Sequence, residues 1–280
     1  MRKRLVKKIK VALVQMDVGP DRDKNLSRAK TLIEKAMNEN PDVICLPELF
    51  SYMGSFHDPQ SVAETKRGPS ITMLCDIAAH HRVHIVAGSV LERTSKGRPK
   101  NTCFFIGPNG RIISGYSKMH LFDIHVPGKI RFEESKFMTP GKNVAVAKTS
   151  FGRVGFAICN DLRYPEIFRR MILAGARIIF LPAAFTKFTG RDHWISLIKV
   201  RAIENQCYVV AVNQSGKNAD GVRFFGSSIA CDPWGNFIKE GPPKGDAVLA
   251  CEIDLGNVDR IRRDLPALKK IRRSYPLRIY

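Results

Sequence analysis

The chain has 280 residues, of which 44% are hydrophobic and 26% charged, so it can bury a sizeable core as one large domain or two small ones. Its seven cysteines are odd in number and include no C-x-x-C pair, which argues against a disulfide framework or zinc ribbon and favours a reducing, cytoplasmic setting. No stretch reaches the roughly 18 apolar residues of a spanning helix, and the apolar run 11–14 is too short for a signal peptide, so we expect no membrane segment.

The net charge of +20 is concentrated at the two ends of the chain. Residues 1–10 carry +6 and residues 258–280 carry another +6, which leaves +8 for everything between them. The basic stretch 260–273 has no interleaved aromatic side chains, and no nucleic-acid recognition motif occurs. We therefore expect no nucleic-acid partner, and a solvated or subunit-contacting arm at the C-terminus.

Short apolar strands alternate with amphipathic helices from the start of the chain. The first half is predicted to contain a strand at 9–15, a helix at 24–38, a buried strand at 43–46, a helix at 71–80 and a strand at 83–90.

The middle of the chain is rich in predicted strands, and the alternation then resumes. Strands are predicted at 102–106, 112–116, 144–147, 154–158, 177–181, 208–213, 226–231 and 247–253, with helices at 165–174 and 192–205.

Two segments of the sequence share the same pattern. Residues 42–48 (DVICLPE) and 177–183 (RIIFLPA) both place Leu-Pro at the end of a buried strand. Two pseudo-repeated α/β halves would explain this, and no linker-like stretch separates them. The sequence therefore predicts two sheets packed face to face with helices outside, which is a four-layer α-β-β-α sandwich.

Cys159 ends the predicted strand 154–158 and is followed closely by Pro165, which is expected to open a helix. A helix N-terminus lowers the pKa of a nearby thiol, so Cys159 is a candidate nucleophile. The alternative is a buried inert thiol, which is the interpretation we give to most of the other cysteines.

Glu48 and Lys118 also follow predicted strands. Glu48 comes after a fully apolar strand, where a carboxylate can serve as a general base, although a surface cap is the alternative. Lys118 has aromatic and apolar neighbours and could hold an oxyanion, although most lysines are simply solvated. Since α/β sheets place their sites at the carboxyl ends of strands, Glu48, Lys118 and Cys159 are expected to form one site.

These residues stand in motifs that resemble the carbon–nitrogen hydrolases of the nitrilase superfamily, whose catalytic set is Glu, Lys and Cys. The motifs are LPEL at 46–49, KMHLF at 118–122, CNDLRYPE at 159–166, RAIENQ at 201–206 and DPWG at 232–235. The resemblance implies a carbon-nitrogen hydrolase domain over residues 9–255, followed by a basic C-terminal arm over 256–280.

Within that superfamily, residues 122–135 are similar to the ω-amidases, which implies that Glu134 is a second active-site acid. The resemblance predicts hydrolysis of a small carboxamide, in particular a short dicarboxylate monoamide, to an acid and ammonia through a cysteine thioester. Asn160 after the cysteine is instead similar to N-carbamoyl amino-acid amidohydrolases, but those usually have two arginines after Asp161, so the amidase is ranked first. A non-catalytic binding protein on the same fold is the least favoured alternative.

The resemblance implies neither a metal nor an organic cofactor, and the expected ligand is a small amide substrate. Relatives are dimers or larger, so a homodimer or higher homo-oligomer is expected. The candidates for substrate binding, from their family positions, are Tyr52, Phe122, Asn160 and Ala184.

Overall fold

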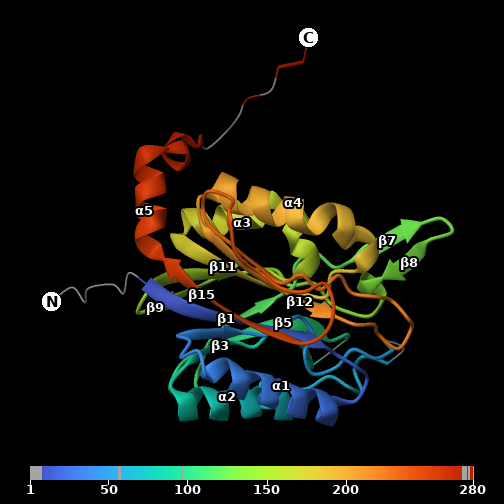
Figure 1. The fold of residues 1–280 in the computed structure, drawn as a ribbon. Coiled ribbons are helices and arrows are strands. Elements are labelled where there is room, and N and C mark those ends of the chain that lie inside the picture. Colours follow the sequence, from blue (N-terminus) through green and yellow to red (C-terminus); the bar gives the residue numbers. More distant parts are fainter. Residues whose placement is uncertain (1–7, 56–57, 96, 273–275, 277, 280) are drawn as a thin grey trace.

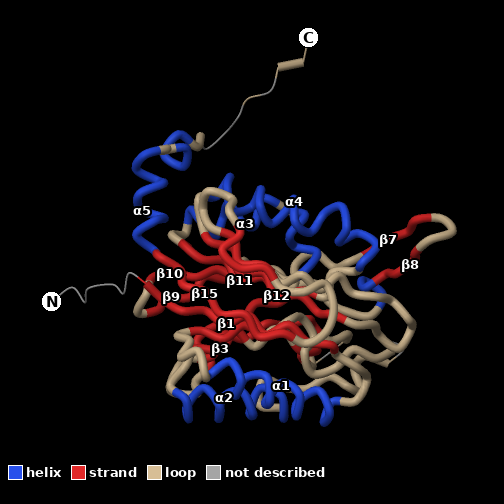
Figure 2. Tube along the Cα trace, viewed as in Figure 1, coloured by secondary structure: helices blue, strands red, loops and turns tan. Residues whose placement is uncertain are grey.

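Two β-sheets lie face to face in the middle of the molecule, and helices cover the outer face of each sheet (Figure 1). The computed structural model describes residues 8–55, 58–95, 97–272, 276 and 278–279. Coloured by secondary structure, the strands form two central layers between two layers of helices (Figure 2). The predicted four-layer α-β-β-α sandwich is therefore confirmed.

The first sheet contains seven strands and is covered by α1 (Arg22–Met37) and α2 (Pro69–His81). Its strands are β1 (Lys8–Asp17), β2 (Val43–Cys45), β3 (His84–Val86), β4 (Val90–Glu92), β5 (Lys100–Ile106), β6 (Ile112–Ser117) and β15 (Ala247–Asp254).

The second sheet contains six strands and is covered by α3 (Pro165–Leu173) and α4 (Lys187–Asn205). Its strands are β9 (Ala145–Thr149), β10 (Gly152–Phe156), β11 (Ala176–Ala183), β12 (Tyr208–Ser215), β13 (Ile229–Cys231) and β14 (Phe237–Glu240).

The two sheets join at one end, where β1 and β12 run parallel and Met16 and Asp17 pair with Gln214 and Ser215. From this junction the strand order is β1-β2-β3 on one side and β12-β11-β10 on the other. The two Leu-Pro segments thus occupy equivalent places, since β2 and β11 are each the second strand from the junction. This is the geometry expected of two pseudo-repeated halves.

Strand β1 shows why these residues form a sandwich. Its side chains point alternately to opposite faces, and both faces are buried. Val11 and Leu13 belong to the core between the two sheets, whereas Ala12 and Val14 pack with the core beneath α1 and α2. A continuous apolar run is therefore required at residues 11–14, because neither face of the strand contacts solvent there.

The predicted strand at 83–90 is wrong in one respect, because it is divided into β3 and β4. Gly88 between them has φ +52°, and a Cβ atom there would lie 2.0 Å from the carbonyl oxygen of Pro47. The break lets the chain pass close to the loop that carries Glu48. That close approach depends on contacts distant in sequence, which the local pattern does not contain.

The strands β7, β8 and β14 and the helix α5 (Leu255–Asp264) were not predicted from the sequence. Strands β7 (Asp123–Val126) and β8 (Ile130–Glu133) form a separate hairpin that projects beyond the sandwich (Figure 1). The helix predicted at 192–205 begins earlier, at Lys187, because Thr186 caps it by accepting a hydrogen bond from the Thr189 N–H.

After β15 the chain forms α5 (Leu255–Asp264), whose side chains Val258 and Ile261 are buried. Arg262 on the same helix donates to the carbonyl oxygens of Gln206 and Ala176. The division of the chain at residue 255 stays a prediction, and residues 1–7 lie outside the described residues. In the part of the chain that is described, no helix is long and apolar enough to cross a membrane.

Candidate active site

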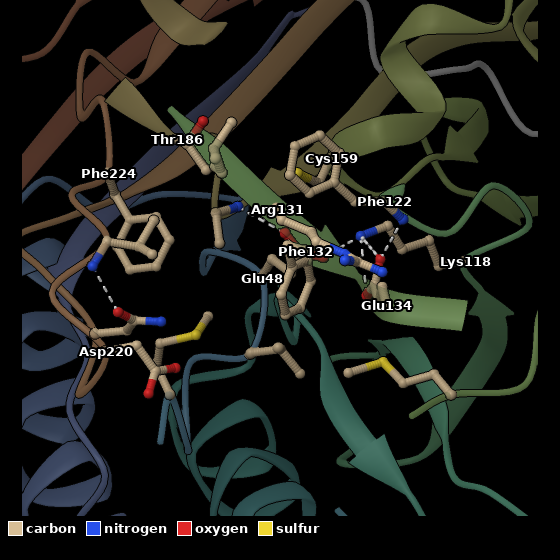
Figure 3. A pocket seen from close by; sticks show the side chains of 17 residues that line it. Glu48, Lys118, Phe122, Arg131, Phe132, Glu134, Cys159, Thr186, Asp220 and Phe224 are labelled. Carbon is tan, nitrogen blue, oxygen red and sulfur yellow. Dashed lines mark hydrogen bonds and ion pairs between the residues drawn. The ribbon is translucent and has the colours of Figure 1, made fainter. Parts of the chain in front are cut away.

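Four loops meet at the edge of the sandwich where the strands end, and each contributes one of the predicted catalytic side chains. Glu48 follows β2, Lys118 directly follows β6, Cys159 follows β10, and Glu134 directly follows β8 in the short turn η1 (Glu134–Lys136). All four line one cavity of about 260 Å³ (Figure 3). The structure thus brings together the four residues that the sequence places up to 111 positions apart.

Lys118 is the electrostatic centre of the cluster. Its Nζ atom lies 2.9 Å from Oε1 of Glu48 and 2.8 Å from Oε2 of Glu134, and all three side chains are at most 4% exposed. Burial by itself lowers the pKa of the Lys118 ammonium, but the two carboxylates outweigh it and hold that pKa well above its ordinary value. Burial raises the pKa of Glu134, and Lys118 opposes that rise.

Backbone and amide donors fix the position of the Glu48 carboxylate. The Ala184 N–H donates to its Oε2 at 2.7 Å, while Lys118 and Asn101 donate to its Oε1. Gln214 on β12 donates to the Glu48 carbonyl oxygen at 2.7 Å. Glu48 is therefore held from both sheets at once, by Lys118 and Asn101 from the first and by Ala184 and Gln214 from the second.

Asn101 on β5 is a residue that sequence reasoning missed. It is 1% exposed, and its Nδ2 atom lies 2.8 Å from Glu48 Oε1 and 3.4 Å from Glu134 Oε1. Its carbonyl oxygen accepts the Lys118 N–H. The Asn101 side chain thus contacts both carboxylates, and its main chain holds the backbone of Lys118. An Asn within a strand carries no local signal of such a role.

The expectation of a low thiol pKa at Cys159 is wrong. Cys159 does not face a helix N-terminus, because it begins a short 3₁₀ turn, η2 (Cys159–Arg163), and α3 starts only at Pro165. Burial, reinforced by the negative charge of Glu48, raises the pKa of the Cys159 thiol well above its ordinary value, although Lys118 opposes this. The resting thiol is therefore protonated.

The Cys159 backbone lies in the left-handed region with φ +46°, which is a strained conformation for a residue with a side chain. Asp161, two residues on, supports this turn by accepting hydrogen bonds from the Ile158 N–H at 2.9 Å, the Tyr116 hydroxyl at 2.7 Å and the His120 N–H at 3.0 Å. A single buried carboxylate thus ties the turn of Cys159 to the loop of Lys118.

Three of the four predicted substrate-binding residues lie at the site. Phe122 and Ala184 line the main cavity, and Asn160 lines an adjoining narrow recess that Cys159 also lines. Tyr52 is not among the residues that line the cavity: its hydroxyl donates to the Ser55 carbonyl oxygen and its ring packs with the core under the first sheet, so its role stays a prediction. From the same loop, Leu49 and Met53 line the cavity.

Asn160 and the neighbouring Arg163 differ in what they offer a ligand. The Asn160 amide already donates to the carbonyl oxygens of His120 and Leu121 and accepts from Arg163 Nε. Arg163 lines the recess beside Cys159, lies over the Phe185 ring and pairs with no carboxylate among the described residues. Its guanidinium hydrogen-bonds Asn160 and His193, so it is a cation near the thiol without a carboxylate partner among the described residues. Sequence reasoning used Arg163 only as part of a motif.

The remaining wall of the cavity is largely apolar, with Phe132, Met138 and Phe224 among its side chains (Figure 3). Thr186 and Asp220 line both this cavity and a neighbouring groove on the surface, so they lie toward the opening of the cavity. Within the described ranges, no group of three or more His, Cys, Asp or Glu side chains is placed to hold a metal ion.

Comparison with known proteins agrees with this arrangement. The carbon-nitrogen hydrolase family model matches residues 10–263. The chain is 35% identical to omega-amidase NIT2-A of Xenopus laevis over 95% of this chain and 96% of that protein, and 34% identical to a deaminated glutathione amidase of Synechocystis over 92% and 96%.

A solved structure shows the same fold. Nit3 of Saccharomyces cerevisiae, a member of branch 10 of the nitrilase superfamily, superposes with a TM-score of 0.86 at 31% identity, covering 95% of this chain and 97% of that one. The family match spans nearly the whole chain, and the relatives are similar over almost their full lengths. The chain therefore belongs to the carbon-nitrogen hydrolase family, among the amidases of the nitrilase superfamily.

Proposed function

We propose that this amidase hydrolyses the carboxamide of a short dicarboxylate monoamide, such as succinamate or 2-oxoglutaramate, to the dicarboxylic acid and ammonia. The observation that supports the proposal is that Cys159 lines both the cavity of Glu48, Lys118 and Glu134 and the narrow recess of Arg163, whose guanidinium pairs with no carboxylate among the described residues. A carboxylate is a natural partner of a guanidinium, and a substrate carboxylate at Arg163 would bring the amide of a short substrate close to the thiol.

The first chemical step is acylation of Cys159. Glu48 takes the thiol proton as the sulfur attacks the amide carbon, so the C–S bond forms while the C=O bond becomes an oxyanion. Lys118 and the backbone N–H of Asn160 hold that oxyanion. The intermediate collapses with cleavage of the C–N bond, and Glu48 returns the proton to the departing ammonia.

Deacylation uses the same residues, and water now takes the place of the departed ammonia. Glu48 accepts a proton from water as the water oxygen attacks the thioester carbon, and the C–S bond breaks to release the acid and regenerate the thiol. Lys118 stays protonated throughout, because its pKa lies well above its usual range. Glu134 accepts hydrogen bonds from Lys118 and from the Phe122 N–H, and so orients the ammonium.

The main rival is hydrolysis of N-carbamoyl amino acids, which the same four residues could perform. The two reactions differ in their products, since a carbamoyl substrate also releases carbon dioxide and an amine. We would measure ammonia and carbon dioxide from succinamate, an aliphatic amide, a nitrile and several N-carbamoyl amino acids, and compare kcat/KM. Preference for carbamoyl compounds with release of carbon dioxide would overturn the proposal.

The nucleophile is tested separately by Cys159→Ala, with Cys75→Ala on α2 as the matched control. We expect the first variant to abolish succinamate hydrolysis and the second to keep it, with melting temperatures within about 2 °C of the native protein. Substantial turnover by Cys159→Ala would reject Cys159 as the nucleophile.

A further inference from the structure

A second cavity, of about 390 Å³, adjoins one wall of the active-site cavity, and we call it the rear cavity. Its lining comes from the end of β1, the start of α4, residues 216–225 and the loop that precedes β15. Phe224 lines both cavities, whereas none of the four predicted catalytic residues lines the rear one. The proposed reaction therefore makes no use of this second space.

The wall between the two cavities is a short hairpin of residues 216–224. Lys217 forms an antiparallel bridge with Arg223, and the Asn218 N–H donates to the Val222 carbonyl oxygen at 3.0 Å. Side chains alternate between the two faces of such a hairpin. Asn218 and Val222 accordingly line the active-site cavity. Lys217 and Arg223 line the rear cavity from the opposite face.

Exposed cations from separate parts of the chain surround the rear cavity. They are Lys187, Lys217, Arg223 and Lys244, and the lining includes one acid, Asp17. Among the described residues, none of the four cations forms an ion pair with a carboxylate, although exposed pairs occur elsewhere on the surface. The rear cavity therefore has an excess of positive charge, which attracts anions.

Asp17 supports the base of the hairpin. Its carboxylate packs against Gly216, where an added Cβ atom would lie 2.0 Å from the Asp17 Oδ1 atom. Burial raises the pKa of the Asp17 carboxyl, while the charge of Arg28 and the backbone N–H of Lys217 oppose that rise. The partners of this carboxylate are thus Arg28 and the main chain of the hairpin, which leaves the four cations available to a ligand.

The main chain holds the cations around this one space. The Lys187 N–H donates to the Arg223 carbonyl oxygen at 2.7 Å, which joins α4 to the hairpin. The loop that carries Lys244 is tied to the first sheet, because Gln15 Nε2 donates to the Gly245 carbonyl oxygen at 2.9 Å. A site whose main chain is already in place loses less conformational entropy when a ligand binds.

We propose that the rear cavity binds a dianionic phosphate group, as free phosphate or as a phosphate monoester, and that the bound group stabilises the hairpin 216–224. Lysine and arginine side chains are the usual partners of phosphate, and a dianion gains more from several cations than a single negative charge does. Since the other face of the hairpin lines the active-site cavity, the anion would influence substrate binding without contacting the substrate. The site is thus regulatory and does not depend on which amide is hydrolysed.

Isothermal titration calorimetry at about pH 8, where a phosphate monoester is a dianion, measures the binding. The probes are inorganic phosphate, glycerol 3-phosphate and dimethyl phosphate, which is a diester with one negative charge. At about 20 mM salt we expect at least one dianion to bind roughly fivefold or more tightly than the diester, and this preference should shrink at about 500 mM salt. Tighter binding of glycerol 3-phosphate would support a monoester as the ligand, and tighter binding of inorganic phosphate would support free phosphate. Equal binding of all three probes, or of none, would overturn the inference.

The variant Lys217→Gln with Lys244→Gln removes two cations that line the rear cavity but not the neighbouring surface groove. The matched control, Lys129→Gln with Arg191→Gln, removes two cations that line the groove but not the rear cavity. We expect the affinity for the dianion to fall about fivefold or more in the first variant and less than about twofold in the control. The opposite result would place the anion in the groove and reject the rear cavity as its site.

Hydrogen exchange tests the link between the anion and the hairpin. A saturating dianion should slow amide exchange in residues 216–224 by about threefold or more in the native protein and the control, but not in the variant Lys217→Gln with Lys244→Gln. The reference segment is the β7–β8 hairpin, which contributes to the active-site cavity but not to the rear one. Equal slowing in both segments, or in neither, would contradict the proposal. The measurement requires no substrate, so its outcome is separate from that of the succinamate assay.

Discussion

Lys118 is one cation between two carboxyl groups, and the Cys159 thiol lines the same buried cavity. Burial first, and then the negative charge of Glu48, disfavours a thiolate in this setting and raises the thiol pKa. The arrangement disfavours a thiolate at rest. It favours a transfer of the proton from Cys159 to Glu48 while the sulfur attacks the substrate.

The variant Glu48→Gln separates the effect of Glu48 on the thiol pKa from its role as the base in proton transfer. Removing the negative charge lowers the pKa of the Cys159 thiol and increases the thiolate fraction at a given pH, so alkylation by iodoacetamide should persist or accelerate. Amide hydrolysis should fall by about 10² or more, because no base remains for proton transfer. Mass spectrometry of alkylated Cys159 and a succinamate assay measure the two rates, with Glu166→Gln on α3 as the control. Parallel loss of both activities would contradict this account of the thiol.

Asn101→Ala tests the amide that spans the two carboxylates. Loss of an N–H donor raises the pKa of the Glu134 carboxyl further, so the acid limb of the kcat profile should move to higher pH. We expect kcat to fall about tenfold with a small change in KM, since Asn101 positions the acids and does not line the cavity. Asn236→Ala, at a surface turn, should leave the profile unchanged. A uniform loss of activity at all pH values would indicate a purely structural role.

The residues that sequence reasoning found share one property, which is that each follows a strand. Glu48, Lys118 and Cys159 could be predicted as neighbours because the ends of strands meet at one edge of a sheet. Asn101 could not, since it lies within a strand and its role depends on which face meets the two acids. That Leu49 and Met53, and not Tyr52, line the cavity could not be predicted either, because the path of the loop after Glu48 is set by packing that the sequence does not display.

At the level of elements, the break between β3 and β4 controls the loop of Glu48. Gly88→Ala would place a methyl group 2.0 Å from the Pro47 carbonyl oxygen, in a backbone conformation that disfavours side chains. We expect a loss of about 2 kcal/mol or more in stability and a fall in kcat, because Pro47 and Glu48 must shift. Thermal melting and succinamate turnover measure the two effects.

The control for this variant is Gly97→Ala. Gly97 has φ +80°, but nothing lies within 4 Å of the added methyl group. The Gly97→Ala variant should therefore lose only the modest amount of stability that the backbone conformation costs, and it should keep full activity. Equal effects of the two variants would mean that the contact with Pro47 is unimportant.

The buried strands and amphipathic helices could be predicted because their apolar spacing is set by burial on one or both faces. The β7–β8 hairpin was missed for the opposite reason. Its residues are half-buried or exposed, so it lacks an apolar run, and it forms its own two-stranded sheet outside both cores. It nevertheless supplies Phe132 to the cavity and leads directly into Glu134.

At the scale of the whole molecule, the helix α5 and the residues after it differ in what they contribute to stability. A chain ending at residue 272 should melt like the native protein and keep its activity, since the described residues that it lacks, 276, 278 and 279, are exposed and do not line the cavity. A chain ending at residue 254 should lose about 3 kcal/mol or more, because the buried Val258 and Ile261 are removed. Differential scanning calorimetry of the two truncated proteins measures this contrast. A large drop in melting temperature for the longer one would show that the basic end is structural.

The last strand of the molecule returns to the first. Although β15 follows the second sheet in sequence, it pairs antiparallel with β1 from Lys8 to Gln15 and so completes the first sheet. Each half thus holds only part of the chemistry, with Glu48, Lys118 and Glu134 before the exposed link at residues 142–143 and Cys159 after it. A chain cut at that link would consist of two inactive fragments that interlock through β15. Mixing them should restore amide hydrolysis, and reassembly would then report whether the two fragments associate inside a cell.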